Sequence, residues 1–245
     1  MSMAGFETEK LDVPLAWSYS RWNDYDGCPA KFRAKYLGTD EEKAQFKESD
    51  EAEPGAPETP MQRGSRIHKL GEDFLKGKIA VVPKEFSKFK KEMLELKKLH
   101  ASSEESWAYD AAWEPCEYFS KRPPVAVRMK VDTHVVINGG EVLRAIDFKT
   151  GKVKDYGLEP QLELVAIGGF LRYKKVKRVE TEFWFLDHGE SRQMNYGEWQ
   201  LDVMKENWER RTRKMLVDTL FEETPSNMCK WCPRQKDKPG GTCKF

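Results

Sequence analysis

The stretch Val131–Gly151 reads VDTHVVINGGEVLRAIDFKTG and contains the pattern that decides the fold. Two runs rich in β-branched and apolar residues flank Asn138-Gly139-Gly140, and a sequence of this kind is typical of a hairpin turn. We therefore predict two paired strands, over residues 125–137 and 141–149, joined by a tight connection.

An acid and an amine end the second of these strands. Side chains alternate along a strand, so Asp147 and Lys149 are expected on one face and Phe148 on the other. Asp132 comes from the paired strand. Two carboxylates can bind a hard divalent cation, and a lysine can orient a hydroxide or stabilise the charge on a phosphate. Taken alone, Asp-x-Lys is more typical of a surface salt bridge on a hairpin.

Length and composition limit the number of domains and the class of protein. The 245 residues suffice for one sizeable core, or for one core and a small appendage. The 42 Lys and Arg residues nearly balance 41 Asp and Glu, so a nucleic-acid site would have to be a local patch. The sequence shows no apolar run long enough to span a membrane and no signal-peptide core. We therefore expect a cytoplasmic protein that does not associate with membranes.

The N-terminal region divides into three kinds of segment. Residues 1–14 suggest an irregular arm, and a short helix is predicted from about Ser18 to Gly27. Pro29 suits the first turn of a second helix. Residues 39–60 are acidic and rich in Pro, Gly, Ser and Ala, which predicts a flexible loop.

A predicted helix over residues 62–75 carries His68 near its start, beside an apolar stripe. A histidine in such a place is either a hydrogen-bonded residue at the edge of the core or, as a neutral imidazole, a metal ligand. Periodicity predicts the remaining elements: helices over 84–100, 160–173 and 199–220, and strands over 107–119 and 179–186.

The C-terminal tail carries Cys229, Cys232 and Cys243 in a segment rich in Gly, Pro and Lys that cannot build its own core. This spacing indicates metal ligation. A closed tetrahedral site needs a fourth thiolate. Cys28, which is also followed by proline, is the best candidate, although a lone cysteine can simply be a small buried apolar residue. Cys116 is the competitor, within a strand-like run.

The chemistry-bearing residues follow one order along the chain: Cys28-Pro29, His68, Asp132, Asp147-Phe148-Lys149-Thr150-Gly151, Gln161, Cys229, Cys232 and Cys243. Over residues 18–245 this order resembles the PD-(D/E)XK nuclease superfamily. More narrowly, it resembles the RecB-like exonucleases with an iron–sulfur cluster, which include CRISPR-associated exonucleases and AddB nuclease domains.

The resemblance implies an α/β (α+β) fold with a restriction-endonuclease-like core, in which helices flank a central mixed sheet. It also implies a cysteine-rich metal clip that joins the C-terminus to the N-terminal helical region. The parts expected along the chain are an arm and helical region with the first cysteine (1–38), an acidic flexible loop (39–60), the nuclease core (61–224) and the iron–sulfur tail (225–245).

Carried over residue by residue, the resemblance implies that His68, Asp132 and Asp147 bind Mg²⁺ or Mn²⁺. Lys149 would position the attacking water. Gln161 would match the glutamine of a Gln-x-x-x-Tyr helix motif that contacts DNA or orders the site, so the expected catalytic set is Asp132, Asp147, Lys149 and Gln161. Here the chain departs from the pattern, because Val165 stands where the motif has tyrosine.

The same resemblance implies a [4Fe-4S] cluster on Cys28, Cys229, Cys232 and Cys243. The interval from Cys232 to Cys243 is longer than is usual in the family, so zinc is the alternative cofactor.

The expected function is a metal-dependent DNA exonuclease that acts on single- or double-stranded ends in recombination, repair, or phage or CRISPR DNA processing. A recombination or CRISPR-adaptation protein is the expected type of partner, and an oligomer is compatible with the sequence. The alternatives are a non-catalytic DNA-binding or scaffold subunit of the same fold and a zinc-tailed interaction protein. The intact Asp, Asp, Lys set argues against the first, and the second leaves that set unexplained.

Overall fold

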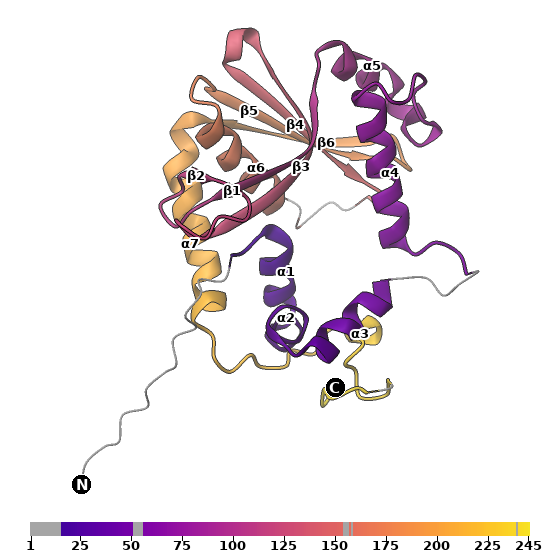
Figure 1. Ribbon diagram of the computed structural model, residues 1–245, viewed down its shortest axis with the longest axis vertical. Coiled ribbons are helices and arrows are strands. Elements are labelled where there is room, and N and C mark those ends of the chain that lie inside the picture. Colours follow the sequence, from indigo (N-terminus) through magenta and orange to yellow (C-terminus); the bar gives the residue numbers. More distant parts are fainter. Residues whose placement is uncertain (1–15, 51–55, 154–156, 158, 239) are drawn as a thin grey trace.

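A six-stranded mixed sheet forms the centre of the computed structural model, which describes residues 16–50, 56–153, 157, 159–238 and 240–245 (Figure 1). The strand order is β2-β1-β3-β4-β5-β6, and the β4–β5 pair is parallel whereas the other pairs are antiparallel. The strands are β1 (Ser102–Tyr109), β2 (Pro115–Cys116), β3 (Val127–Ile137), β4 (Val142–Lys149), β5 (Arg178–Phe185) and β6 (Glu190–Gly197). The predicted mixed sheet is confirmed.

The predicted hairpin is also confirmed. β3 and β4 pair from Ile137–Val142 to Thr133–Ile146, and the 3-10 turn η3 (Asn138–Gly140) connects them. Asn138 and Gly139 have φ values of +53° and +68°, in the left-handed region that Asn-Gly sequences favour. The turn therefore fixes the register that places Asp147 near Asp132.

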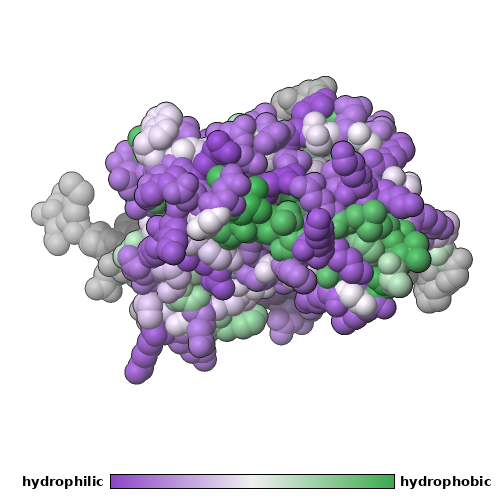
Figure 2. All heavy atoms as spheres, turned by 90° about the horizontal axis from the view of Figure 1, so that it is seen from above, coloured by the Kyte–Doolittle hydropathy of each residue, from purple (hydrophilic) through white to green (hydrophobic). Residues whose placement is uncertain are grey.

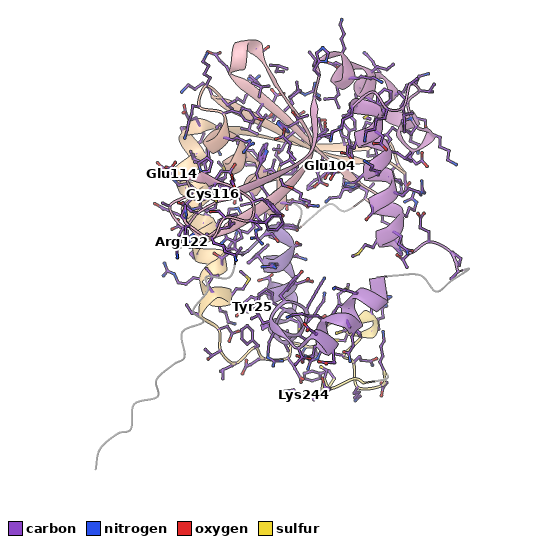
Figure 3. All side chains as sticks on the ribbon, in the orientation of Figure 1. Tyr25, Glu104, Glu114, Cys116, Arg122 and Lys244 are labelled. Carbon is purple, nitrogen blue, oxygen red and sulfur yellow. The ribbon has the colours of Figure 1, made fainter. Side chains whose placement is uncertain are left out.

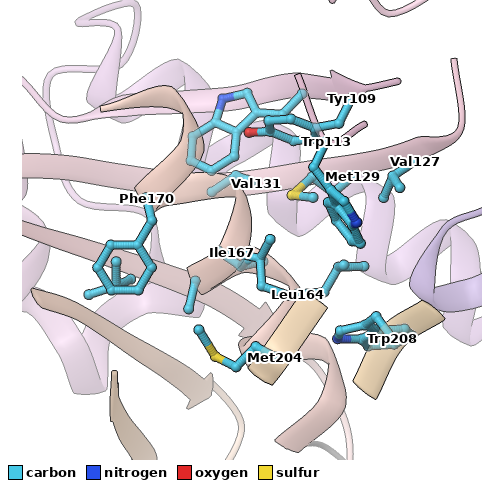
Figure 4. Packing of buried hydrophobic residues seen from close by; sticks show 14 of the residues in the cluster. Tyr109, Trp113, Val127, Met129, Val131, Leu164, Ile167, Phe170, Met204 and Trp208 are labelled. Atoms are coloured by element: carbon cyan, nitrogen blue, oxygen red, sulfur yellow. The ribbon is translucent and has the colours of Figure 1, made fainter. Parts of the chain in front are cut away.

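Helices cover both faces of the sheet (Figure 1). One layer consists of α4 (Pro60–Leu75), η2 (Lys84–Phe89) and α5 (Lys90–Lys98), and the other of α6 (Glu159–Arg172), η4 (Glu198–Gln200) and α7 (Leu201–Val217). Ile67 and Phe74 of α4 pack with Phe148 on the first side. On the second side, buried residues of β1 and β3 pack against α6 and α7, as Figure 4 shows. The sheet residues there alternate with those that face α4.

A smaller group of elements lies below the sheet in Figure 1. It comprises α1 (Tyr19–Gly27), α2 (Pro29–Phe32), the π-helix η1 (Arg33–Leu37), α3 (Asp40–Asp50) and the tail with η5 (Cys229–Trp231). Ser18 caps α1 by accepting a hydrogen bond from the Arg21 N–H, as the sequence predicted. The Ala30 N–H donates to Glu222 O, which holds the start of the tail against α2.

The predicted flexible loop over 39–60 is wrong for residues 40–50, which form α3. Thr39 and Glu42 make a capping box: the Glu42 N–H donates to Thr39 Oγ1 at 3.2 Å, and the Thr39 N–H donates to Glu42 Oε2 at 2.9 Å. Residues 51–55 and the predicted arm over 1–14 lie outside the described residues. The sequence also gave no prediction for β6, an edge strand whose side chains are mostly exposed.

Figure 2 shows a mostly hydrophilic surface from above, with hydrophobic side chains gathered near the middle and at one side. Among the described helices, none has both the length and the apolar character that crossing a bilayer requires.

Gly168 permits the close approach of α6 to the sheet, and its substitution tests that packing. A Cβ at this position would lie 2.6 Å from Met129 Sδ and 3.0 Å from Trp107 Cε3. We expect Gly168→Ala to lower the free energy of unfolding by about 1–3 kcal/mol, despite the better helix propensity of alanine. Gly64→Ala in α4 is the control, because the nearest atom would be 3.8 Å away. Urea denaturation checks both, and equal stability of Gly168→Ala and wild type would contradict this account.

Candidate active site

The backbone ladder between β3 and β4 stops at the candidate site. Its last pair is Thr133–Ile146, and beyond this pair Asp132 Oδ2 accepts the hydrogen bond of the Phe148 N–H at 2.7 Å. Asp132 is only 8% exposed. A buried carboxylate thus replaces a backbone carbonyl as the partner of a strand N–H. The small crevice at this point is lined by Lys130, Asp132 and Asp147, among others.

His68 reaches this point from α4. Its Nε2 lies 3.0 Å from Phe148 O, and because a carbonyl can only accept, Nε2 donates. Its Nδ1 lies 3.3 Å from Asp132 Oδ1 and 3.4 Å from Glu104 Oε1. Burial alone would lower the pKa of His68, but the hydrogen bonds to Asp132 and Glu104 outweigh it and raise the pKa to about 10. A cation bound by these carboxylates would compete with that proton.

A closed triangle of polar contacts joins the side chains of Lys149, Asp147 and Gln161, next to the point where the β3–β4 ladder stops. Lys149 Nζ lies 2.6 Å from Asp147 Oδ1 and donates to Gln161 Oε1 at 3.0 Å. Gln161 Nε2 in turn donates to Asp147 Oδ2 at 2.5 Å. Burial raises the pKa of Asp147 to about 6, although the charge of Lys149 acts in the opposite direction. The glutamine of α6 therefore fixes the orientation of both catalytic candidates on β4.

Val165, at the position of the motif tyrosine, is 7% exposed and lines the same crevice. An apolar side chain there packs into the core next to the carboxylates. In this chain, the α6 residue one turn after Gln161 contributes packing and offers no polar group.

Glu104 belongs to the site, and the sequence did not single it out. β1 pairs with β3 at Ser103–Thr133 and Glu105–Val131, which places Glu104 opposite Asp132. Its φ is +54°, a conformation that costs about 1–3 kcal/mol in a non-glycine residue. Figure 3 shows Glu104 between the sheet and α4. The strand was predicted to begin only at residue 107, so no signal in the sequence distinguished this glutamate from its neighbours.

The oxygen donors fit a hard divalent cation. Metal-binding atoms of His68, Glu104 and Asp132 lie within 4.8 Å of one another. Among the described residues, two buried carboxylate oxygens keep only ion-pair contacts: Glu104 Oε1 lies 3.4 Å from His68 Nδ1, and Asp147 Oδ1 lies 2.6 Å from Lys149 Nζ. Buried carboxylate oxygens are normally satisfied, and Mg²⁺ or Mn²⁺ would satisfy these.

The structure brings Cys28, Cys229, Cys232 and Cys243 to one cavity of about 340 Å³, which Phe46 and Trp231 also line. Backbone N–H groups approach two of the sulfurs: that of Lys31 lies 3.5 Å from Cys28 Sγ, and that of Ser226 lies 3.2 Å from Cys229 Sγ. Such donors stabilise thiolates. Cys116 lies on β2 and is not among the residues that line this cavity.

The pKa of His68 predicts a pH dependence of stability. In EDTA, folded His68 retains a proton that the unfolded chain loses above about pH 6.5. The free energy of unfolding should therefore fall as pH rises from about 6.5 toward 10, and His68→Gln should remove this part of the slope. His188→Gln, at an exposed histidine, should leave it intact. Urea denaturation at several pH values checks this, and equal slopes in wild type and His68→Gln would exclude the protonated ring.

Comparison with known proteins adds independent information. No curated protein matches the chain. Among solved structures, SSO0001 is 15% identical with a TM-score of 0.43, and the match covers 98% of this chain and 90% of that one. A candidate exonuclease from Eubacterium rectale is 13% identical with a TM-score of 0.41, and the match covers 93% of this chain and 98% of that one.

The sequence profile of the PD-(D/E)XK nuclease superfamily matches residues 16–236. This range includes the sheet, both helical layers, Cys28 and the Asp132–Lys149 hairpin. The mixed sheet flanked by helices is also the architecture expected of a restriction-endonuclease-like core. The chain therefore belongs to the PD-(D/E)XK nuclease superfamily.

Proposed function

We propose that the protein is a metal-dependent deoxyribonuclease that hydrolyses phosphodiester bonds at DNA ends. The observation that supports this best is the meeting of His68, Asp132, Asp147 and Lys149 where β3 and β4 separate. DNA recombination, repair or CRISPR adaptation is the setting that the sequence resemblance suggests.

The proposed metal-binding residues are His68, Asp132 and Asp147, and we add Glu104 because its carboxylate lies 3.4 Å from the His68 ring. When bound, Mg²⁺ or Mn²⁺ supplies Lewis-acid stabilisation of phosphate charge and acidifies water. A nitrogen donor suits Mn²⁺ better than Mg²⁺. Asp132 has a second role in this proposal, because its other oxygen holds the Phe148 N–H and so fixes the end of β4.

Lys149 is proposed to orient the attacking water. Its ammonium group has three N–H donors, and Asp147 and Gln161 account for two of them. The third can hold a water in line with the phosphorus atom and stabilise charge on the phosphate oxygens. Gln161 acts through Lys149 and Asp147, since it contacts both side chains.

The four cysteines are proposed to bind a [4Fe-4S] cluster, with zinc as the alternative. All four cysteines line one cavity of about 340 Å³, which supports a shared metal group, and the sequence resemblance favours the cluster. Either group would join α2 to the tail, so metal loss should destabilise this part of the molecule.

Cleavage by site variants tests the proposed chemistry. Asp147→Ala removes a metal ligand and Lys149→Ala removes the group that orients water, so each should lower cleavage at least ~10²-fold without unfolding the protein. Asp202→Ala and Lys174→Ala are the controls. Both change exposed side chains that are not part of the proposed site, and both variants should cleave DNA like wild type. The measurement uses end-labelled single- and double-stranded DNA with Mg²⁺, Mn²⁺ or EDTA. Full activity in EDTA, or in either site variant, would refute the assignment.

The cysteine assignment predicts a coloured protein. Purified without oxygen, it should be brown, absorb broadly near ~400 nm and contain about four irons per chain. Changing any of Cys28, Cys229, Cys232 or Cys243 to Ser should bleach the colour and lower the melting temperature. Cys116→Ser should do neither, because its side chain lies away from the cavity. A colourless protein with one zinc would refute the cluster, and colour loss in Cys116→Ser would refute the choice of Cys28.

A further inference from the structure

One face of the first half of β3 leads away from the candidate active site, and it is exposed to solvent at Lys130. Met129 and Val131 pack beneath α6, so Arg128 and Lys130 point to the opposite face, the face of Asp132. Lys130 is exposed, and so is Ser106, its partner on β1. Positions of alternate residues on a strand are about 7 Å apart. The face thus carries cations at regular steps from the carboxylates.

The cations of this face lack acidic partners. Among the described residues, Lys130 makes no hydrogen bond or ion pair, and no carboxylate pairs with Arg128 or Arg21. Arg128 donates through Nε to Tyr118 O at 2.9 Å, which leaves its terminal nitrogens available. Burial lowers the pKa of Arg21, and the nearby charge of Arg128 lowers it further. Neighbouring cations without a carboxylate between them are typical of a surface that binds anions.

Aromatic rings lie next to these cations. The Arg128 guanidinium is 5.2 Å from the ring centres of both Tyr118 and Phe119. Phe119 is 78% exposed, so most of its ring is free to stack on another flat group. Cations combined with an exposed aromatic ring are the usual elements of a surface that binds single-stranded nucleic acid.

We infer that a single DNA strand leaving the active site runs along this face, with successive phosphates on Lys130 and Arg128 and a base stacked on Phe119. We name these three residues the β3 track. The inference rests on the proposed function, since it takes the scissile phosphate to lie at Asp132 and Asp147. It specifies a single strand, because the bases inside a duplex are stacked on both faces and cannot place a free face on Phe119.

Binding of a fluorescent oligo(dT) strand to the full chain in EDTA tests the track without cleavage. Lys130→Ala and Arg128→Ala should each weaken binding and reduce the slope of log affinity against log salt by about 0.7. Phe119→Ala should weaken binding about tenfold and leave that slope unchanged. Lys174→Ala, at an exposed lysine beyond the end of α6, is the matched control and should bind like wild type.

A covalently closed circular duplex, which has no terminal base pair, distinguishes stacking from charge. Phe119→Ala should bind this duplex like wild type, whereas equal losses for duplex and single strand would overturn the stacking role. If Lys130→Ala and Phe119→Ala bind oligo(dT) like Lys174→Ala, the track is wrong. Both side chains are exposed, so unchanged melting temperatures will separate binding from folding even if Arg128→Ala is unstable.

These outcomes are independent of the catalytic test. If Asp147→Ala loses cleavage and all track variants bind DNA like wild type, the nuclease proposal is supported and the track is refuted. If the track variants weaken DNA binding but the wild-type protein cleaves no DNA with any metal, the track is supported and the nuclease proposal is refuted.

Discussion

The hydrogen bond from the Phe148 N–H to the Asp132 carboxylate is the interaction on which the site depends. It satisfies a strand N–H at the point where the ladder stops, so β3 and β4 can separate without leaving a buried donor unpaired. The same carboxylate faces His68 and Glu104. One side chain thus belongs both to the sheet and to the candidate metal site, so the hairpin fixes the position of that site.

Each helical layer contributes one polar side chain to this centre. α4 presents His68 to the Asp132 side, and α6 presents Gln161 to the Asp147–Lys149 side. Below the sheet, Glu42 of α3 binds both Arg33 and Arg234, the latter at 2.8 Å. The acidic segment therefore acts as a connector between the N-terminal helices and the cysteine-rich tail, a role that its composition did not suggest.

The sequence allowed prediction of the features that depend on local pattern. Alternation placed Asp147 and Lys149 on one face, and Asn138-Gly139 located the turn. Glu104 could not be found in this way, because its position depends on a positive φ that glutamate rarely adopts. α3 was missed although Thr39 and Glu42 form a capping box, because the segment has too few apolar residues to show a buried helical face. The polar edge strand β6 has too few buried side chains to show alternation.

The cysteine cavity joins the two ends of the described chain, and this has a consequence for the order of folding. The β3–β4 hairpin needs only neighbouring residues, so it can form early and on fast timescales. The cavity needs Cys28 and Cys243 together, so its lining is incomplete until Cys243 has been synthesised. The hairpin can therefore be in place before the four cysteines meet, and closure of the cavity follows formation of the sheet.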